Sequence, residues 1–198
     1  MAFRNIEVHH ALYGRLRKLD VEAAKRFPRQ FFPGLGSLGL ILNRKLDQGR
    51  YSWCTPLNCR TFANTGGEGV HFSFLITGQM IQESAPVVIT NPGAGGESLI
   101  VGEDLFDFLC LGANRGYFAL EQLSYNRDLT LEVYTNPGWQ PTESWHSSVG
   151  YSPDNEVREL LSFLAEKLNL RPWSTTERFQ ALQERWSGLP QYPEQLYG

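Results

Sequence analysis

The side chains that could carry nucleophilic or acid–base catalysis are His71, Ser73 and Cys110. A serine or cysteine nucleophile needs a neighbouring base, and histidine is the usual one. Cys110 lies inside the apolar run 108–111, where a thiol stays protonated and unreactive. Ser73 has no sharp turn around it, and no carboxylate is paired with His71 in the sequence. We therefore predict a protein without catalysis, and keep an enzyme with a dispersed site near His71 as a less favoured alternative.

The residue types that bind metals or phosphates occur here at unsuitable spacings. His9 and His10 are adjacent, so on a helix their side chains point about 100° apart and cannot chelate one ion. Cys54 and Cys59 are spaced more widely than in a zinc knuckle and have no second pair. The glycine-rich segment 91–98 lacks the Gly-Lys-Ser/Thr ending of a phosphate-binding loop and precedes a strand, not a helix. We expect no metal and no cofactor.

Composition indicates a folded protein of a reducing compartment. The chain has 198 residues, 41% of them hydrophobic, which is enough to bury a full core. Its three cysteines form an odd set without a disulfide framework, so free thiols are expected. Residues 1–7 show no signal-peptide core, and no run approaches the ~20 apolar residues of a membrane span. The sequence predicts a cytoplasmic protein that does not contact membranes.

Charge is unevenly distributed along the chain, whose net charge is −3. Residues 1–30 carry seven basic and three acidic side chains, whereas residues 91–160 carry three basic and eleven acidic ones. The basic helix face near the N-terminus has no interleaved aromatics, so a solvated face is favoured and no nucleic-acid binding is expected. The acidic segment 91–160 could attract a basic protein, because such fields raise association rates. The alternative is that these charges only solvate loops and helix faces.

Hydrophobic periodicity predicts helices at both ends of the chain and strands between them. An N-terminal helix is expected over 12–27, interrupted or re-capped near Asp20, and two short helices over 104–112 and 114–123. Ser152-Pro153 and the capping box 174–177 predict two C-terminal helices. Strands are expected over 37–42, 51–54, 60–64, 70–77, 87–90, 99–101 and 129–134. The predicted fold is a single α+β domain, 1–198, with a central, mainly antiparallel sheet flanked by N-terminal and C-terminal helices, the last forming an extension from about residue 152.

One stretch of the chain shows the succession of motifs of a known family. A turn rich in glycine enters a strand, a Pro-Val-Val strand and a loop follow, and a short strand leads into a helix. The matching segments are Gly66-Gly67-Glu68-Gly69, Val70-His71-Phe72-Ser73-Phe74-Leu75, Pro86-Val87-Val88 and Leu105-Phe106-Asp107-Phe108-Leu109. Over roughly residues 62–125 the chain thus resembles the SUKH superfamily, the SMI1/KNR4-like proteins. Residues 1–42 lack the Leu-Pro and aromatic signature with which the family usually opens.

This resemblance implies protein binding. SUKH proteins are mostly bacterial immunity proteins that bind and neutralise the toxin domains of polymorphic or contact-dependent systems, many of them nucleases. A cognate toxin or another basic protein is therefore the expected partner. The fungal members imply an alternative, a regulatory adaptor that connects signalling with cell-wall synthesis.

Partner-binding residues are expected in the acidic segment 91–160. Its acidic candidates are Glu97, Glu103, Asp104 and Asp107. Trp139 and Trp145 lie in the long connection that follows, where exposed aromatic side chains commonly anchor a partner. Alternatively, both tryptophans fold back and cover the sheet.

Overall fold

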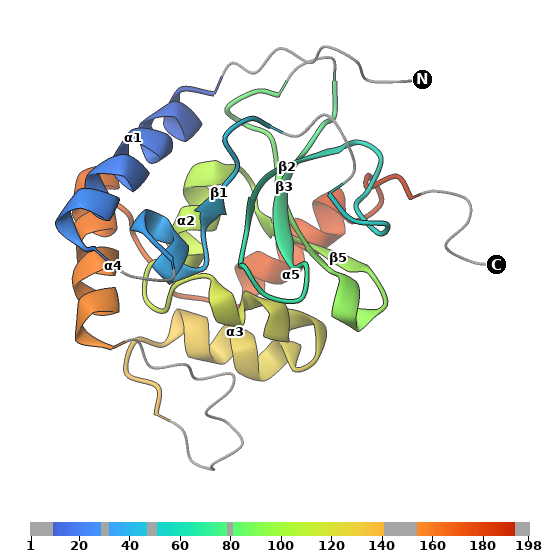
Figure 1. Cartoon of the computed structure of the whole chain (residues 1–198). Coiled ribbons are helices and arrows are strands. Elements are labelled where there is room, and N and C mark those ends of the chain that lie inside the picture. The colour runs from blue at the N-terminus through green and yellow to red at the C-terminus, as the bar shows by residue number, and fades with distance from the viewer. Residues whose placement is uncertain (1–9, 29–31, 47–50, 79–80, 141–153, 193–198) are drawn as a thin grey trace.

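A five-stranded antiparallel sheet forms the centre of the computed structural model, which describes residues 10–28, 32–46, 51–78, 81–140 and 154–192. The strands pair in chain order (Figure 1). They are β1 (Ile41–Leu42), β2 (Cys59–Asn64), β3 (His71–Leu75), β4 (Val87–Asn91) and β5 (Glu97–Gly102). The helices, 3₁₀ turns (η) included, are α1 (Ala11–Arg26), η1 (Gly34–Leu38), η2 (Pro92–Ala94), α2 (Leu105–Gly112), η3 (Phe118–Ser124), α3 (Arg127–Thr135), α4 (Asn155–Leu168) and α5 (Glu177–Trp186). The predicted α+β class is confirmed.

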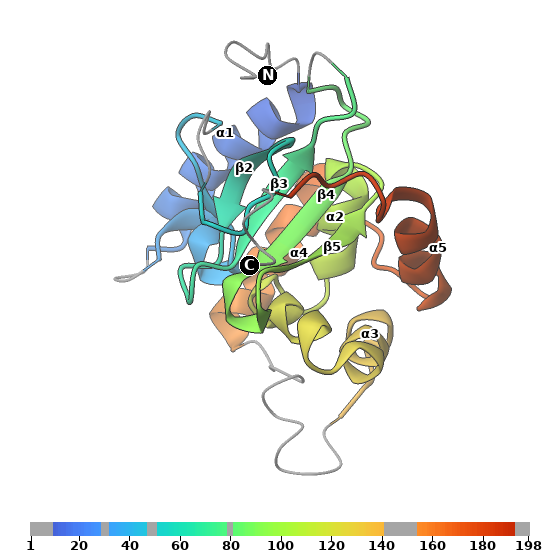
Figure 2. The same ribbon diagram turned by 90° about the vertical axis from the view of Figure 1, so that its right-hand side faces the viewer.

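Helices cover one face of the sheet, and loops cover the other. On the helical side Phe72 of β3 packs against Phe108 of α2, with ring centroids 4.8 Å apart. On the opposite side the segment that follows α5 crosses in front of the sheet (Figure 2). There the carbonyl of Gln191 accepts a hydrogen bond from the backbone N–H of Leu57 (2.6 Å). All five residues of β3 are consequently buried.

The glycine-rich turn before β3 has the predicted conformation. Gly66, Glu68 and Gly69 have φ values of 84°, 49° and 76°, in the left-handed region where glycine is favoured. The aromatic face of the hairpin is buried as expected, and Phe62 of β2 stacks on Phe74 of β3 with centroids 4.5 Å apart. Local sequence therefore determines this part of the sheet.

Helix α1 runs unbroken past Asp20, so the predicted interruption there is wrong. The Asp20 carboxylate does not cap the helix, because it accepts a hydrogen bond from the backbone N–H of Leu35 in η1 (2.8 Å). His10 caps the start of the helix by accepting from the N–H of Tyr13 (3.2 Å). The apolar stripe of α1 is buried against the core as predicted.

Two predicted strands are largely absent. In the segment 37–42, residues 37–38 end the 3₁₀ turn η1, and only Ile41–Leu42 pair with β2. Gly39, with φ 83°, ends η1 in the left-handed region, which prevents an extended strand from beginning earlier. Residues 51–54 form turns and bends that cover the sheet. Leu38, Leu40 and Cys54 are buried, whereas Tyr51 and Trp53 are exposed.

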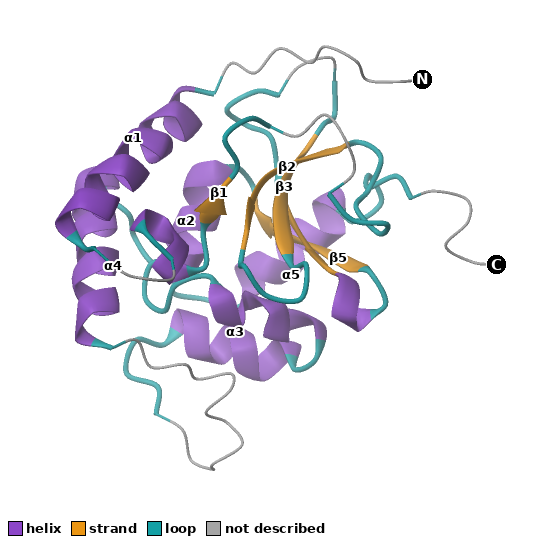
Figure 3. Ribbon diagram, viewed as in Figure 1, coloured by secondary structure: helices purple, strands orange, loops and turns teal. Residues whose placement is uncertain are grey.

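The strand predicted over 129–134 is wrong, because this segment is helix α3 (Figure 3). Its leucines and valine alternate with other residues, and a short run of that kind fits the two-residue period of a strand as well as the 3.6-residue period of a helix. The buried residues are Thr130, Leu131, Val133 and Tyr134, which is the spacing of one helix face. Asp128 in the first turn favours the helix through the helix dipole.

The C-terminal helices form as predicted, with shifted ends. Asp154 caps α4 by accepting from the N–H of Val157 (2.8 Å), and Ser152 lies outside the described residues. The helix ends at Leu168, where Asn169 takes φ 54°, and not at the expected 171–172. Among the described residues, no helix has both the length and the apolar character needed to cross a bilayer.

Helix α5 packs along the outer edge of β5. Its Gln183 side chain donates from Nε2 to the carbonyl of Ile100 (2.6 Å) and accepts on Oε1 from the N–H of the same residue (3.1 Å). Phe179 and Leu182 are the buried residues of this helix. A side-chain amide and two apolar side chains therefore fix α5 to the sheet.

Candidate functional site

The four predicted acidic residues do not form a free acidic surface. Glu97 forms an ion pair with Arg127 of α3 (3.1 Å), and Glu103 forms one with Arg185 of α5. Asp104 caps α2 by accepting from the N–H of Asp107 (2.8 Å). Each of these acids is engaged within the chain, and their role in binding a basic partner stays a prediction.

Asp107 is a structural residue, with only 6% of its surface exposed. Its carboxylate accepts hydrogen bonds from Nε1 of Trp173 (2.9 Å) and from the backbone N–H of Glu103 (3.0 Å). It also pairs with Arg178 of α5 at 2.7 Å. One carboxylate thus joins the start of α2 to the segment between α4 and α5.

The two predicted aromatic anchors have different outcomes. Trp139 is only 7% exposed and belongs to the hydrophobic core, so it is not available as a surface anchor. Its burial agrees with the alternative that it folds back onto the protein. Trp145 lies outside the described residues.

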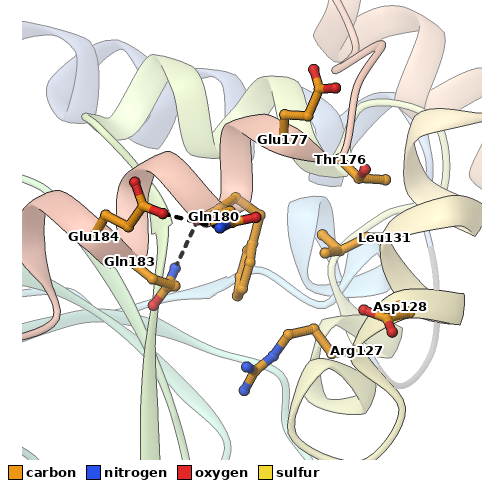
Figure 4. A pocket seen from close by; sticks show the side chains of 9 residues that line it. Arg127, Asp128, Leu131, Thr176, Glu177, Gln180, Gln183 and Glu184 are labelled. Atoms are coloured by element: carbon orange, nitrogen blue, oxygen red, sulfur yellow. Dashed lines mark hydrogen bonds between the residues drawn. The ribbon is translucent and has the colours of Figure 1, made fainter.

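A groove of about 490 Å³ lies between α3 and α5. Leu131 of α3 and Phe179 of α5 lie at its floor, and both are almost fully buried. Figure 4 shows the polar side chains of the two helices around it. These are Arg127 and Asp128 from α3, Gln180, Gln183, Glu177 and Glu184 from α5, and Thr176 immediately before α5. Sequence reasoning missed this groove because it interpreted α3 as a strand.

The groove carries uncompensated negative charge. Its one cation, Arg127, is neutralised by Glu97, which lies at the start of β5. Within the described part of the chain, no Lys, Arg or His nitrogen lies within 4.0 Å of the carboxylates of Asp128, Glu177 or Glu184. All three of these residues are exposed. Exposed acidic side chains without a cation partner suit a basic segment of another protein.

Exposed apolar side chains also occur on the loop-covered face of the sheet. Tyr51, Trp53 and Leu57 of the loop before β2 are 37%, 54% and 42% exposed, and Leu189 is 42% exposed. Aromatic residues of this kind are frequent in protein interfaces. This face therefore offers contact area that sequence reasoning missed, because residues 51–54 were predicted to be a strand.

His71 is fully buried and has both ring nitrogens hydrogen-bonded. Nδ1 donates to the carbonyl of Gly69 (2.7 Å), since a carbonyl only accepts, and Nε2 then accepts from Oγ1 of Thr55 (2.9 Å). The Tyr51 ring packs on the imidazole with centroids 4.7 Å apart. This arrangement gives the imidazole no contact with solvent.

The stability of the protein is expected to fall below about pH 6.5. Burial lowers the pKa of His71 from its ordinary value of 6.5, and burial also lowers the pKa of His10, with Glu83 acting in the opposite direction. A histidine that is neutral in the folded state and protonated in the unfolded state favours unfolding as the pH falls. The loss approaches ~1.4 kcal/mol per pH unit for each histidine.

Urea denaturation between about pH 5.5 and 7.5 measures this dependence. Burial raises the pKa of the Asp20 and Glu121 carboxyls, so these two groups act in the opposite direction and favour the folded state as the pH falls. His71→Gln should reduce the slope. A free energy of unfolding that stays constant or rises on acidification would contradict the prediction.

The thiols are free and buried, as predicted. Burial raises the pKa of Cys59 to about 12 and also raises that of Cys110. A protonated, inaccessible thiol is a poor nucleophile. No group of three or more His, Cys, Asp or Glu side chains in the described ranges could hold a metal ion.

Comparison of the chain with family models, with curated proteins and with solved structures found no match. The resemblance to the SUKH superfamily stays a prediction from the motifs within residues 62–125. What the structure establishes is the α+β architecture with helices on one face of an antiparallel sheet.

Proposed function

We propose that this chain is a non-catalytic, cytoplasmic protein-binding domain that recognises a basic protein. The observation that carries the proposal is the groove between α3 and α5, where the exposed side chains of Asp128, Glu177 and Glu184 have no cation partner in the described part of the chain. Together with the resemblance to SUKH proteins, this supports an immunity protein whose partner is a toxin domain. A nuclease is a suitable toxin, because its nucleic-acid-binding surface is basic.

Inhibition would follow from occlusion of that basic surface. The acidic side chains of the groove attract the toxin over a distance and raise the association rate. No catalytic group is needed for this mechanism, since a bound immunity protein prevents the toxin from reaching its nucleic acid.

Affinity purification of the tagged protein from its native cell, followed by mass spectrometry, tests the proposal. We expect one stoichiometric partner with a basic domain. If a signalling or cell-wall protein is recovered in its place, the adaptor function implied by the fungal members replaces the immunity function. If nothing specific is retained while the toxin gene is expressed, the proposal is wrong.

Removing two charges of the groove should slow association with the recovered partner. The variant Asp128→Asn/Glu184→Gln keeps side-chain shape and removes negative charge from both walls. We expect the association rate at low salt to fall about fivefold, with a smaller change in the dissociation rate. Stopped-flow or surface plasmon resonance at two salt concentrations measures both rates.

A matched control changes the net charge by the same amount elsewhere. Glu159→Gln/Glu166→Gln alters two exposed residues of α4, which lies apart from α5 in Figures 1 and 2. Its association rate should stay close to that of the wild type. Equal rates for the two variants would show that the groove does not direct binding.

A further inference from the structure

We infer that the segment 51–55, the strap, is a pH-sensitive element that protonation of His71 releases from the sheet. The inference goes beyond the proposed function and does not depend on it. It rests on the contacts that hold the strap over the buried imidazole of His71 and beside Gly96.

Two side chains of the strap close over the ring of His71. The Tyr51 ring lies on the imidazole with centroids 4.7 Å apart, and Oγ1 of Thr55 is hydrogen-bonded to Nε2 at 2.9 Å. His71 has no exposed surface, whereas Tyr51 is 37% exposed. Tyr51 thus stands between the imidazole and water, and movement of the strap would bring the imidazole into contact with solvent.

The strap also lies against the turn between β4 and β5. A methyl group added at Gly96 would come within 2.6 Å of Cβ of Cys54, so the strap approaches this turn closely, and Cys54 is fully buried. Within the strap, the N–H of Ser52 donates to Oγ1 of Thr55 (2.9 Å), and the N–H of Thr55 donates to the carbonyl of Ser52 (3.2 Å). These local hydrogen bonds form a compact turn that can move as one unit.

The hydrogen bonds around His71 suit a neutral imidazole. Nε2 accepts from the Thr55 hydroxyl, whose oxygen in turn accepts from the N–H of Ser52. A proton added at Nε2 would face this same oxygen, so the hydroxyl would have to turn its hydrogen away and would lose its acceptor. The added positive charge would also be buried. Protonation of His71 therefore weakens the attachment of the strap.

The surroundings of His71 offer no opposite charge to compensate the proton. Within the described ranges, no Asp or Glu oxygen lies within 4.0 Å of its ring nitrogens. Its neighbours across the sheet are the uncharged Asn64 and Thr90, and Arg60 lies opposite Phe74 near the other end of β2. Burial accordingly lowers the pKa of His71. The titratable side chains of the two flanking segments, the strap and the turn before β3, are Tyr51, Cys54 and Glu68.

Labelling of Cys54 measures the opening of the strap. Cys54 carries a free, fully buried thiol within the strap, whereas Cys59 lies in β2 and is 2% exposed. The full chain is treated with dithiodipyridine, a small disulfide that reacts with thiols in weak acid, and tandem mass spectrometry assigns the label. Each labelling rate is divided by the rate of the urea-unfolded chain at the same pH, which removes the pH dependence of the reagent.

We expect the normalised rate of Cys54 to rise about tenfold as the pH falls from about 7.5 to about 5.5. The reason is that His71 titrates near its ordinary value of 6.5 when the strap is open, and at lower pH when the strap is closed. The normalised rate of Cys59 should stay at least about tenfold below that of Cys54, because β2 opens only when the sheet unfolds. A Cys54 rate that does not change with pH, or equal normalised rates at both cysteines, would overturn the inference.

Two variants assign the opening to His71. His71→Gln keeps a hydrogen-bonding side chain that does not titrate in this range, so the rise at Cys54 should disappear. His10→Gln is the matched control, since His10 is also buried, and it should leave the rise unchanged. A rise that survives His71→Gln, or one that His10→Gln abolishes, would contradict the assignment to His71.

A third variant tests the strap even if His71→Gln does not fold. Thr55→Val removes the hydroxyl that is bonded to Nε2 of His71. We expect the normalised rate of Cys54 at about pH 7.5 to rise about fivefold, as for the loss of one hydrogen bond, while Cys59 stays slow. An unchanged rate at Cys54 would show that Thr55 does not hold the strap closed, and the inference would be wrong.

Discussion

Replacing Asp107 with alanine is expected to lower the free energy of unfolding by about 3 kcal/mol. The substitution removes the acceptor of a buried indole N–H, of a backbone N–H and of an arginine at once. Nε1 of Trp173 would keep only its longer contact with the backbone carbonyl of residue 107 (3.2 Å). Urea denaturation monitored by far-UV circular dichroism measures the change.

Arg178→Ala is the matched control for the same ion pair. The Arg178 side chain is 47% exposed, so water can replace its carboxylate partner, and solvent screening reduces its contribution. We expect a loss of about 1 kcal/mol or less. If Arg178→Ala loses as much stability as Asp107→Ala, the main contribution of Asp107 to stability is the ion pair and not the network of buried donors.

Gly112→Ala should destabilise the protein by about 3 kcal/mol, the upper part of the range for overpacked cores. A methyl group at the end of α2 would overlap the ring of Tyr117. That ring cannot move aside easily, because it is fully buried and its hydroxyl donates to the carbonyl of Leu109 (2.9 Å). Chemical denaturation of the variant gives the magnitude.

A second glycine in a helix provides the opposite expectation. Gly14 lies within α1, and a methyl group there would meet no atom within 4 Å. Gly14→Ala should therefore stabilise the protein by up to about 1 kcal/mol, because alanine favours helix and restricts the unfolded chain. If the two glycine variants are equally stable, steric overlap with Tyr117 does not determine the stability of Gly112→Ala.

Strong local patterns determined what the sequence could predict. The alternation of Phe72 and Phe74 in β3 and the positive-φ turn before it are consequences of neighbouring residues, so the strand and its turn were predicted correctly. The apolar stripes of α1 and α4 repeat over several helical turns, so they fit a helix and not a strand. The α+β class followed from these elements.

The errors arose where local sequence is ambiguous or where distant residues decide. The short run around Leu131 fits a strand or a helix equally, and burial beside η3 and α2 selects the helix. Asp107 has the spacing of a capping residue relative to Asp104, a signal that was available in the sequence. Its contacts with Trp173 and Arg178 depend on tertiary structure and have no local signal. The groove between α3 and α5 was missed because the run around Leu131 was interpreted as a strand.

The amide of Gln183 has a consequence for the sheet as a whole. By bonding both outward groups of Ile100, it occupies the positions that the backbone of a sixth strand would take. The other edge is β1, only two residues long, which offers little to an incoming chain. Exposed edges are templates for aggregation, and short strands and covering helices are known protections against it. Helix α5 therefore also protects this edge of the sheet from pairing with the edge strand of another copy of the protein.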